Sequence, residues 1–179
     1  MARIGAPCRN LELKAKDRDP ARSLEVCEAL GAEDRGALVQ KDTYFETARG
    51  RLKLREEAGA NAHLIAYERP DLPGHKESQY RIIRVDDPTG LREALSAVLG
   101  ISVVVSKTRR LFVLASTRIH LDRVDGLGHF IEFEGVVSGD GDPGRFAPLL
   151  ADLRRSFAIS EGDLVGGSYS DLLRAAAEV

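Results

Sequence analysis

Charged residues recur at a two-residue spacing in several short segments, two or three to a segment and often of one sign. These segments are Glu12–Lys16, Arg51–Arg55, Lys107–Arg109, Arg118–Asp122 and Glu132–Glu134. Successive side chains of a β-strand point to opposite faces, so this spacing places each set on one face of a strand. Basic side chains bind phosphates, and carboxylates bind hard divalent cations through oxygen. Together these residue types are suited to a site for a metal–polyphosphate complex.

Two arrangements account for strands that are charged on one face and apolar on the other. In the simpler one, an antiparallel sheet exposes its polar face to water. Like charges on one strand are unfavourable, however, unless opposite charges lie nearby. The apolar faces are also rich enough to pack beneath helices, which would turn the charged faces toward the concave side of a curled sheet. A barrel of about eight strands is just wide enough to hold one small ligand.

Such a charged interior cannot be a dry core, because burying an unpaired charge costs several kcal/mol or shifts its pKa. We therefore expect it to hold water, an anion and a metal. One further polar face, with Gln40, Asp42 and Tyr44, belongs to the same pattern. His120 lies between Arg118 and Asp122 on one of the charged faces named above. For His120 we weigh a metal-ligand or acid–base role against an inward residue that hydrogen-bonds a neighbour.

Turn residues divide the chain into short elements that would position these side chains. Period-two alternation and turn signals predict strands over 9–16, 38–46, 51–57, 63–69, 78–85, 102–106, 109–114, 117–122 and 129–137. Asp19-Pro20 and Asp87-Pro88 predict helix starts, which Gly31 and Gly100 would end. Apolar stripes predict two more helices, over 146–153 and 170–177. Hairpin-linked strands with separate helices favour an α+β fold with an antiparallel sheet or barrel.

Composition limits the class of protein. The chain has 179 residues, of which 26 are Lys or Arg and 28 are Asp or Glu, so its formal net charge is −2. This balance argues against a nucleic-acid binder, and 43% hydrophobic residues argue against disorder. No apolar run approaches a membrane span, and two cysteines are too few for a disulfide framework. We expect one domain over residues 1–179 and a soluble, cytoplasmic protein, and we leave a homodimer open.

The order of the charged segments resembles the CYTH family, also called the triphosphate tunnel metalloenzymes. Asn10-Leu-Glu12-Leu-Lys14 is similar to the E-x-E-x-K signature of that family. The further segments that carry the resemblance are Gln40–Phe45, Arg51–Glu56, Ser78–Arg81, Lys107–Arg110, Arg118–Asp122, Gly126–Glu134 and Ser168–Leu173. They span nearly the whole chain, and the last two most resemble the branch that includes the class IV adenylate cyclases.

The resemblance implies an eight-stranded antiparallel β tunnel, a closed barrel with helices packed outside. It also implies a triphosphate-containing substrate and dependence on Mg²⁺ or Mn²⁺. The metal would be held by Glu12, Asp122, Glu132 and Glu134. The phosphates would be held by Lys14, Lys53, Arg55, Arg81, Lys107 and Arg109. Lys14 and Glu12 would be the catalytic residues, with Lys14 stabilising charge on the transferred group.

The chain departs from the family pattern at two positions. Asn10 replaces the first acidic residue of the signature, and it is a neutral oxygen ligand at best. The segment Tyr67–Pro70 lacks a lysine that many members carry. Arg69 could substitute for that lysine, whereas Glu68 in a tunnel would oppose a phosphate.

Three functions therefore remain in view. The leading one is a metal-dependent triphosphatase that acts on inorganic, thiamine or nucleoside triphosphate. The alternative is a class IV adenylate cyclase, which would convert ATP to cyclic AMP and pyrophosphate. The third, motivated by Asn10 and Glu68, is a catalytically weak protein that binds a polyphosphate or a nucleotide.

Overall fold

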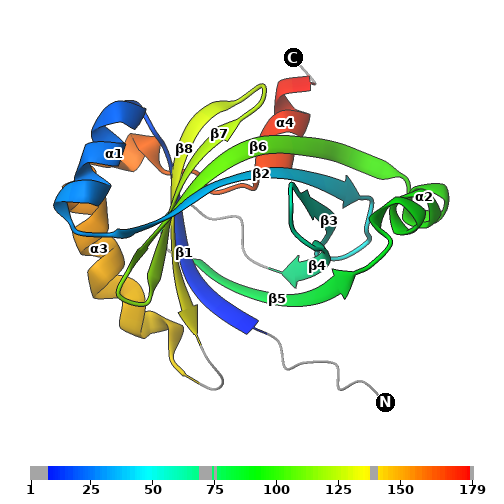
Figure 1. Ribbon diagram of the computed structural model, residues 1–179, viewed down its shortest axis with the longest axis horizontal. Helices are drawn as coiled ribbons and strands as arrows, with labels where there is room; N and C mark the ends of the chain where they lie inside the picture. The colour runs from blue at the N-terminus through cyan, green and yellow to red at the C-terminus, as the bar shows by residue number, and fades with distance from the viewer. Residues whose placement is uncertain (1–7, 69–73, 75, 138–140, 178–179) are drawn as a thin grey trace.

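Eight antiparallel strands form a closed barrel in the computed structural model, which describes residues 8–68, 74, 76–137 and 141–177. The strands are β1 (Cys8–Lys16), β2 (Glu33–Phe45), β3 (Arg51–Glu57), β4 (Ala62–Glu68), β5 (Lys76–Val85), β6 (Ile101–Leu114), β7 (Thr117–Val124) and β8 (Gly128–Val137). Around the barrel their order is β1-β5-β4-β3-β2-β6-β7-β8. The first strand closes the barrel, since β1 pairs with β5 on one side and with β8 on the other (Figure 1).

Four α-helices surround the barrel: α1 (Pro20–Ala29), α2 (Pro88–Leu99), α3 (Ala147–Ser156) and α4 (Tyr169–Ala177). The predicted starts of α1 and α2 are confirmed. Asp19 accepts a hydrogen bond from the Arg22 amide, and Asp87 accepts one from the Gly90 amide, as N-cap residues do. No helix among the described residues has the length and apolar character needed to cross a membrane.

The eight-stranded tunnel is confirmed, and two strands differ from the sequence-based expectation by more than two residues. The segments 102–106 and 109–114 form one strand, β6, which pairs with β2 without interruption from Lys107 to Arg109. The strand β2 begins at Glu33, five residues before the predicted start at Leu38. Its first residues are exposed and polar, so they carry no alternation that would reveal a strand.

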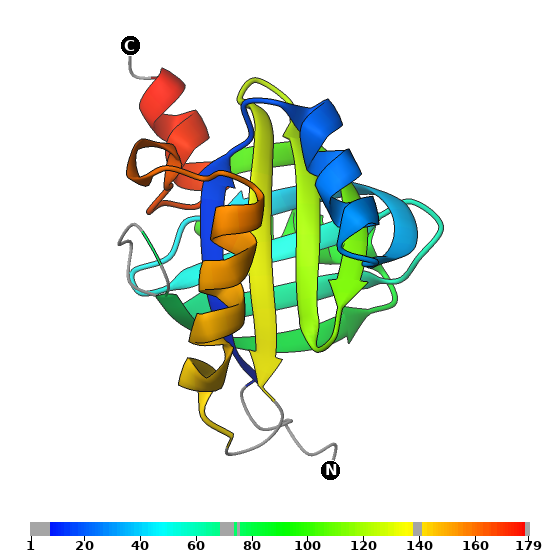
Figure 2. The same ribbon diagram turned by 90° about the vertical axis from the view of Figure 1, so that its left-hand side faces the viewer.

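The main hydrophobic core lies outside the barrel, between its wall and two helices. On β1, Leu11, Leu13 and Ala15 point outward into this core, and Asn10, Glu12 and Lys14 point inward. Figure 2 shows α1 and α3 lying across β1, β7 and β8. Leu150 and Leu153 of α3 and Cys27 of α1 are fully buried there, which confirms Cys27 as a core residue. The helices therefore cover the apolar faces and leave the barrel interior to the charged ones.

Gly135 of β8 allows one close contact on which this packing depends. The ring of Phe146, which is buried, lies directly on the backbone of Gly135. A Cβ atom at position 135 would come within 2.3 Å of the Phe146 Cγ atom, far inside van der Waals contact. Only glycine can occupy this position without displacing the ring.

We predict that Gly135→Ala lowers the free energy of unfolding by about 1–3 kcal/mol, the usual cost of overpacking a core. Urea denaturation followed by circular dichroism would measure the change. Gly162→Ala is the matched control, because its Cβ would meet only the Ser160 hydroxyl oxygen at 3.8 Å. Equal stability of the two variants would contradict the proposed contact.

Candidate active site

The barrel encloses a cavity of about 330 Å³, within the range of about 300–1,000 Å³ typical of small-molecule sites. Its wall comes from strands all around the barrel and from the segment that begins α4. The basic side chains that line it are Lys14, Lys53, Arg55, Lys107, Arg109 and Arg118. The acidic side chains that line it are Glu12, Glu132 and Glu134. Both signs of charge therefore face one enclosed space, as the alternation predicts.

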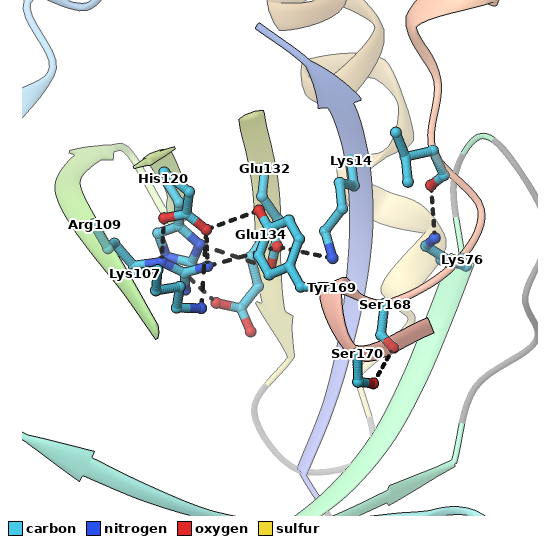
Figure 3. A network of polar contacts seen from close by, with 12 residues as sticks. Lys14, Lys76, Lys107, Arg109, His120, Glu132, Glu134, Ser168, Tyr169 and Ser170 are labelled. Atoms are coloured by element: carbon cyan, nitrogen blue, oxygen red, sulfur yellow. Dashed lines mark hydrogen bonds and ion pairs between the residues drawn. The ribbon is translucent and has the colours of Figure 1, made fainter. Parts of the chain in front are cut away.

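Glu132 joins the basic side chains on two sides of the cavity (Figure 3). One of its carboxylate oxygens lies 3.5 Å from Lys14 Nζ and 3.6 Å from Arg109 Nη2. Burial alone would raise the pKa of Glu132, but Lys14 and Arg109 hold that pKa well below its usual value. Glu132 is therefore ionised at neutral pH and available as an oxygen ligand.

Asp122 stands behind the cavity wall and positions Arg109. The Arg109 guanidinium donates two hydrogen bonds to the carboxylate, at 2.7 and 2.6 Å, and the Tyr169 hydroxyl donates a third at 2.8 Å. Lys107 Nζ lies 3.9 Å from the same carboxylate. Both Asp122 oxygens are thus already engaged, in the bidentate geometry that makes Arg–carboxylate pairs rigid.

Asp42 performs the same task for the adjoining part of the wall, because β3 and β2 precede β6 and β7 in the order of strands. Arg55 donates to it through Nε at 2.7 Å and through Nη2 at 2.6 Å, and Lys53 Nζ donates at 2.9 Å. Burial opposes ionisation of Asp42, but Arg55 and Lys53 keep its pKa well below the usual value. Each pair joins neighbouring strands, since Asp42 is directly opposite Arg55 across β2 and β3.

The lysines of the cavity carry less counter-charge than they need. Burial, with Arg55 nearby, lowers the pKa of Lys53 to about 8 despite the contact with Asp42. Burial and the adjacent Arg109 lower the pKa of Lys107 well below its ordinary value. Both shifts mean that the ammonium form lacks solvation. An anion in the cavity would supply what these groups lack.

The acidic end of the cavity contains the departure from the family signature. Asn10 Nδ2 donates a hydrogen bond to Glu134 at 2.5 Å, which leaves the buried Asn10 Oδ1 with no hydrogen-bond partner in the part of the chain that the structure describes. Arg118 donates to the other Glu134 oxygen at 3.2 Å, and His120 Nε2 lies 3.9 Å from it. Burial, together with Arg109, lowers the pKa of His120, which favours the neutral imidazole.

The oxygen atoms at this acidic end of the cavity are of the kind that binds a hard divalent cation. Carboxylate and amide oxygens are the donors that Mg²⁺ and Mn²⁺ prefer, and Asn10 Oδ1 lacks a partner among the described residues. In the same part of the chain, no three or more His, Cys, Asp or Glu side chains already form a group that could hold an ion.

The comparisons with known proteins agree with this geometry. The model of the CYTH domain matches residues 9–169. The chain belongs to the CYTH family. A Methanocaldococcus jannaschii protein named as a candidate adenylate cyclase is 24% identical over 173 residues, which is 90% of this chain and 97% of that protein.

Two solved structures share the CYTH fold of this chain. A Pyrococcus horikoshii protein superposes with a TM-score of 0.78 at 24% identity, covering 91% of this chain and 98% of its own. A candidate adenylyl cyclase from Hippeastrum, described as revealing a dominant triphosphatase activity, gives a TM-score of 0.66 at 19% identity. That match covers 93% of this chain and 96% of the Hippeastrum chain.

Most of the residues singled out from the sequence line the cavity, but the structure corrects two expectations. Arg81 is exposed on the outer face of β5, whereas its neighbours Tyr80 and Ile82 line the cavity. Arg81 is therefore not placed to contact a phosphate there. Glu68 is also exposed and pairs with Arg49, so it does not oppose an anion in the tunnel. Asp122 is paired with Arg109, and its role as a metal ligand stays a prediction. Arg69 lies outside the described residues.

Sequence reasoning assigned no role to two residues that organise the CYTH cavity. Tyr169 contacts Asp122 and also places its ring 4.0 Å from Lys14 Nζ, a cation–π contact. Its position at the start of α4 depends on the preceding segment, where Lys76 Nζ donates to the Val165 carbonyl. Asp42 was noted only as one member of a polar face. Its pairing with Arg55 could have been found from the register of a β2–β3 hairpin.

We predict that Asp42→Asn lowers the free energy of unfolding by roughly 3–5 kcal/mol, because it leaves two buried cations without their partner. Chemical denaturation at pH 7 would measure the loss. Asp34→Asn is the matched control, since Asp34 also pairs with an arginine, Arg110, but at an exposed position on the same strand. We expect no measurable change for it.

The pH dependence of stability gives a second readout for Asp42. Its pKa is lower in the folded protein than the value of about 3.9 in an unfolded chain. The stabilisation is thus complete above pH 4 and is lost as the pH falls toward the folded value. Asp42→Asn should lack this component, and an unchanged acid profile would contradict the assignment.

Proposed function

We propose that this chain is a divalent-metal-dependent enzyme that hydrolyses a triphosphate inside its barrel. The observation that carries the proposal is the single cavity in which buried lysines and arginines face carboxylates. Phosphoryl transfer needs positioning and charge neutralisation more than covalent participation by the protein. A cavity with fixed charges of both signs supplies both requirements.

The phosphates would lie against the basic side chains of β1, β3 and β6. Arg55 and Arg109 are held rigidly by Asp42 and Asp122, so they present their remaining N–H groups in a fixed direction. Lys53 and Lys107 complete the set, and a bound polyanion would favour their charged forms. Arg-rich and Lys-rich surfaces of this kind bind phosphate oxygens through charge-assisted hydrogen bonds.

The metal, Mg²⁺ or Mn²⁺, would be held by Glu12, Glu132 and Glu134, with Asn10 Oδ1 as a neutral fourth donor. When bound, it would neutralise phosphate charge and polarise a phosphoryl oxygen. Lys14 lies between Glu132 and the Tyr169 ring, where it would stabilise charge on the transferred phosphoryl group. Glu12, two residues away on the same face of β1, also lines the cavity and would accept a hydrogen bond from the attacking water.

Adenylate cyclisation is the second candidate function. It is favoured by the Methanocaldococcus jannaschii relative, which is named as a candidate adenylate cyclase. The Hippeastrum protein, described as having a dominant triphosphatase activity, supports hydrolysis instead. Both reactions would use the same phosphate-binding cations, but they differ in the nucleophile and in the phosphorus attacked. In hydrolysis, water attacks the terminal phosphorus and orthophosphate is released. In cyclisation, the ribose 3′-hydroxyl attacks the α-phosphorus and pyrophosphate leaves.

We expect the purified protein to release orthophosphate from at least one triphosphate when Mg²⁺ or Mn²⁺ is present. ATP, inorganic triphosphate and thiamine triphosphate are the substrates to compare, with products identified by chromatography. Formation of cyclic AMP and pyrophosphate would show that the chain is a cyclase rather than a hydrolase. Tight binding without any turnover would show that it only binds the triphosphate.

Two substitutions test the site within the same assay. Lys107→Ala should weaken triphosphate binding by about 10- to 100-fold, the range expected for one charge-assisted hydrogen bond. Glu132→Gln should raise the metal concentration needed for half-maximal activity. The matched control is Arg81→Ala, which removes a cation from the outer face of the same barrel. A loss in that control as large as in Lys107→Ala would place the phosphates elsewhere.

Lys53 gives the binding reaction a predictable dependence on pH. Below about pH 8 its ammonium form is already present, so Lys53 itself takes up no proton when a triphosphate binds. Above pH 8 binding must also protonate Lys53, and the affinity should fall by up to tenfold per pH unit. The charged and titratable groups facing Lys53 are Asp42, Tyr44, Arg55, Tyr67 and Arg109.

Calorimetric titration with inorganic triphosphate from pH 7 to pH 9.5 would measure this fall. Lys53→Arg is the control, because an arginine keeps its charge over the whole range. Its affinity should fall less steeply than that of the wild type. Parallel slopes for the two proteins would show that Lys53 does not contact the anion.

A further inference from the structure

One part of the cavity wall is not suited to phosphates. Four aliphatic side chains line it: Leu38, Ile65, Ile82 and Leu111. Ile65 and Ile82 are direct partners across β4 and β5. Leu38 of β2 is directly opposite Arg109 of β6. Leu111 is two residues further along β6 on the same face, so it lies near Leu38. An inorganic triphosphate would bring these side chains nothing to pack against.

The two aliphatic pairs come from different sides of the barrel. In the closed order of eight strands, β5 and β6 are four places apart in either direction, so Ile82 and Leu111 belong to opposite walls. Ile82 is 52% exposed although it lines the cavity, a large value for an apolar side chain within a binding site. A flat organic group inserted between these walls would cover it.

Gln40 adds a polar group to the same part of the cavity. Its side chain is buried, and its Nε2 atom donates a hydrogen bond of 2.6 Å to Glu57. A carboxylate can only accept hydrogen bonds, so this contact determines which end of the amide faces Glu57. The carbonyl oxygen, Gln40 Oε1, remains buried and without a hydrogen-bond partner among the described residues.

A buried acceptor without a partner disfavours the empty state and selects a ligand that donates. Gln40 is also next to the phosphate-binding side chains proposed above. It is directly opposite Lys107 across β2 and β6, and it lies two residues before Asp42 on the same face of β2. An organic group at Gln40 could therefore continue into a phosphate chain on Lys107.

We infer that this part of the cavity, formed by Gln40 and the four aliphatic side chains, binds the base of a nucleoside triphosphate that carries an exocyclic amino group. The inference rests on the proposed function, since it concerns the organic part of that substrate. The amino group donates to Gln40 Oε1, and the ring packs between the aliphatic walls. The site thus discriminates against inorganic triphosphate and against bases that lack the amino donor.

The test compares three ligands by calorimetry in the presence of Ca²⁺, so that binding is read separately from turnover. They are ATP, purine riboside triphosphate, which lacks the amino group, and inorganic triphosphate. The wild type should bind ATP at least tenfold more tightly than the purine analogue. Gln40→Met, which keeps the side-chain volume, should reduce this preference to less than threefold.

Lys41→Met is the matched control, because Lys41 is the next residue of β2 and is exposed on its outer face. It should keep the full preference for ATP. Ile82→Ser offers a second variant whose fold is safe, since Ile82 is already half exposed. It should weaken ATP binding several-fold more than the binding of inorganic triphosphate.

The outcomes separate the inference from the function on which it rests. Equal affinity of the wild type for ATP and the purine analogue would overturn the role of Gln40. Equal losses for ATP and inorganic triphosphate in Ile82→Ser would overturn the aliphatic subsite. Failure of all three ligands to bind would overturn the proposed function itself.

Discussion

The architecture depends on two buried carboxylates that hold cations inside the barrel wall. Asp42 binds Lys53 and Arg55, and Asp122 binds Arg109. Desolvating a guanidinium or an ammonium group costs several kcal/mol, and only close pairing with a carboxylate offsets that cost. Because each pair joins adjacent strands, the pairing also fixes the register on which the cavity depends. The main hydrophobic core lies outside the barrel, which leaves the interior to these charged pairs.

The buried cations of the barrel are not fully neutralised by its carboxylates, and this imbalance supports the proposed function. The pKa of Lys107 is lowered by burial and by Arg109, and the side-chain oxygens of Asn10 and Gln40 lack hydrogen-bond partners among the residues that the structure describes. Each of these groups costs free energy in the empty protein that a suitable ligand would recover. The electrostatic free energy of the empty cavity is therefore unfavourable compared with that of the occupied one, as expected of a preorganised site. The same charges therefore affect both the stability of the empty barrel and its affinity for a ligand.

Alternation predicted an antiparallel sheet or barrel with its charged faces on the concave side, because charged and apolar residues separate cleanly on strands such as Glu12–Lys14 and Glu132–Glu134. The family resemblance then specified a closed tunnel of eight strands. Arg81 and Glu68 were misplaced because a family motif does not show which face of its strand each residue occupies. One residue of offset moves a strand side chain from the cavity to the outer surface. Neither Tyr169 nor Gln40 could be assigned, since their roles depend on contacts between elements far apart in the chain.

The position of β1 has a consequence for how the molecule is made. Asn10 meets Glu134 across 124 residues, and the strand that carries the signature pairs only with β5 and β8. During synthesis β1 emerges before the other strands of the barrel, and its edge toward β8 stays unpaired until β8 has also emerged. Contacts at such sequence separation form slowly, because closing the loop costs entropy before any contact stabilises the chain. The pairing of β1 with β8 is thus expected to be the final step of barrel folding, so a nascent chain acquires its charged cavity only after β8 has been translated.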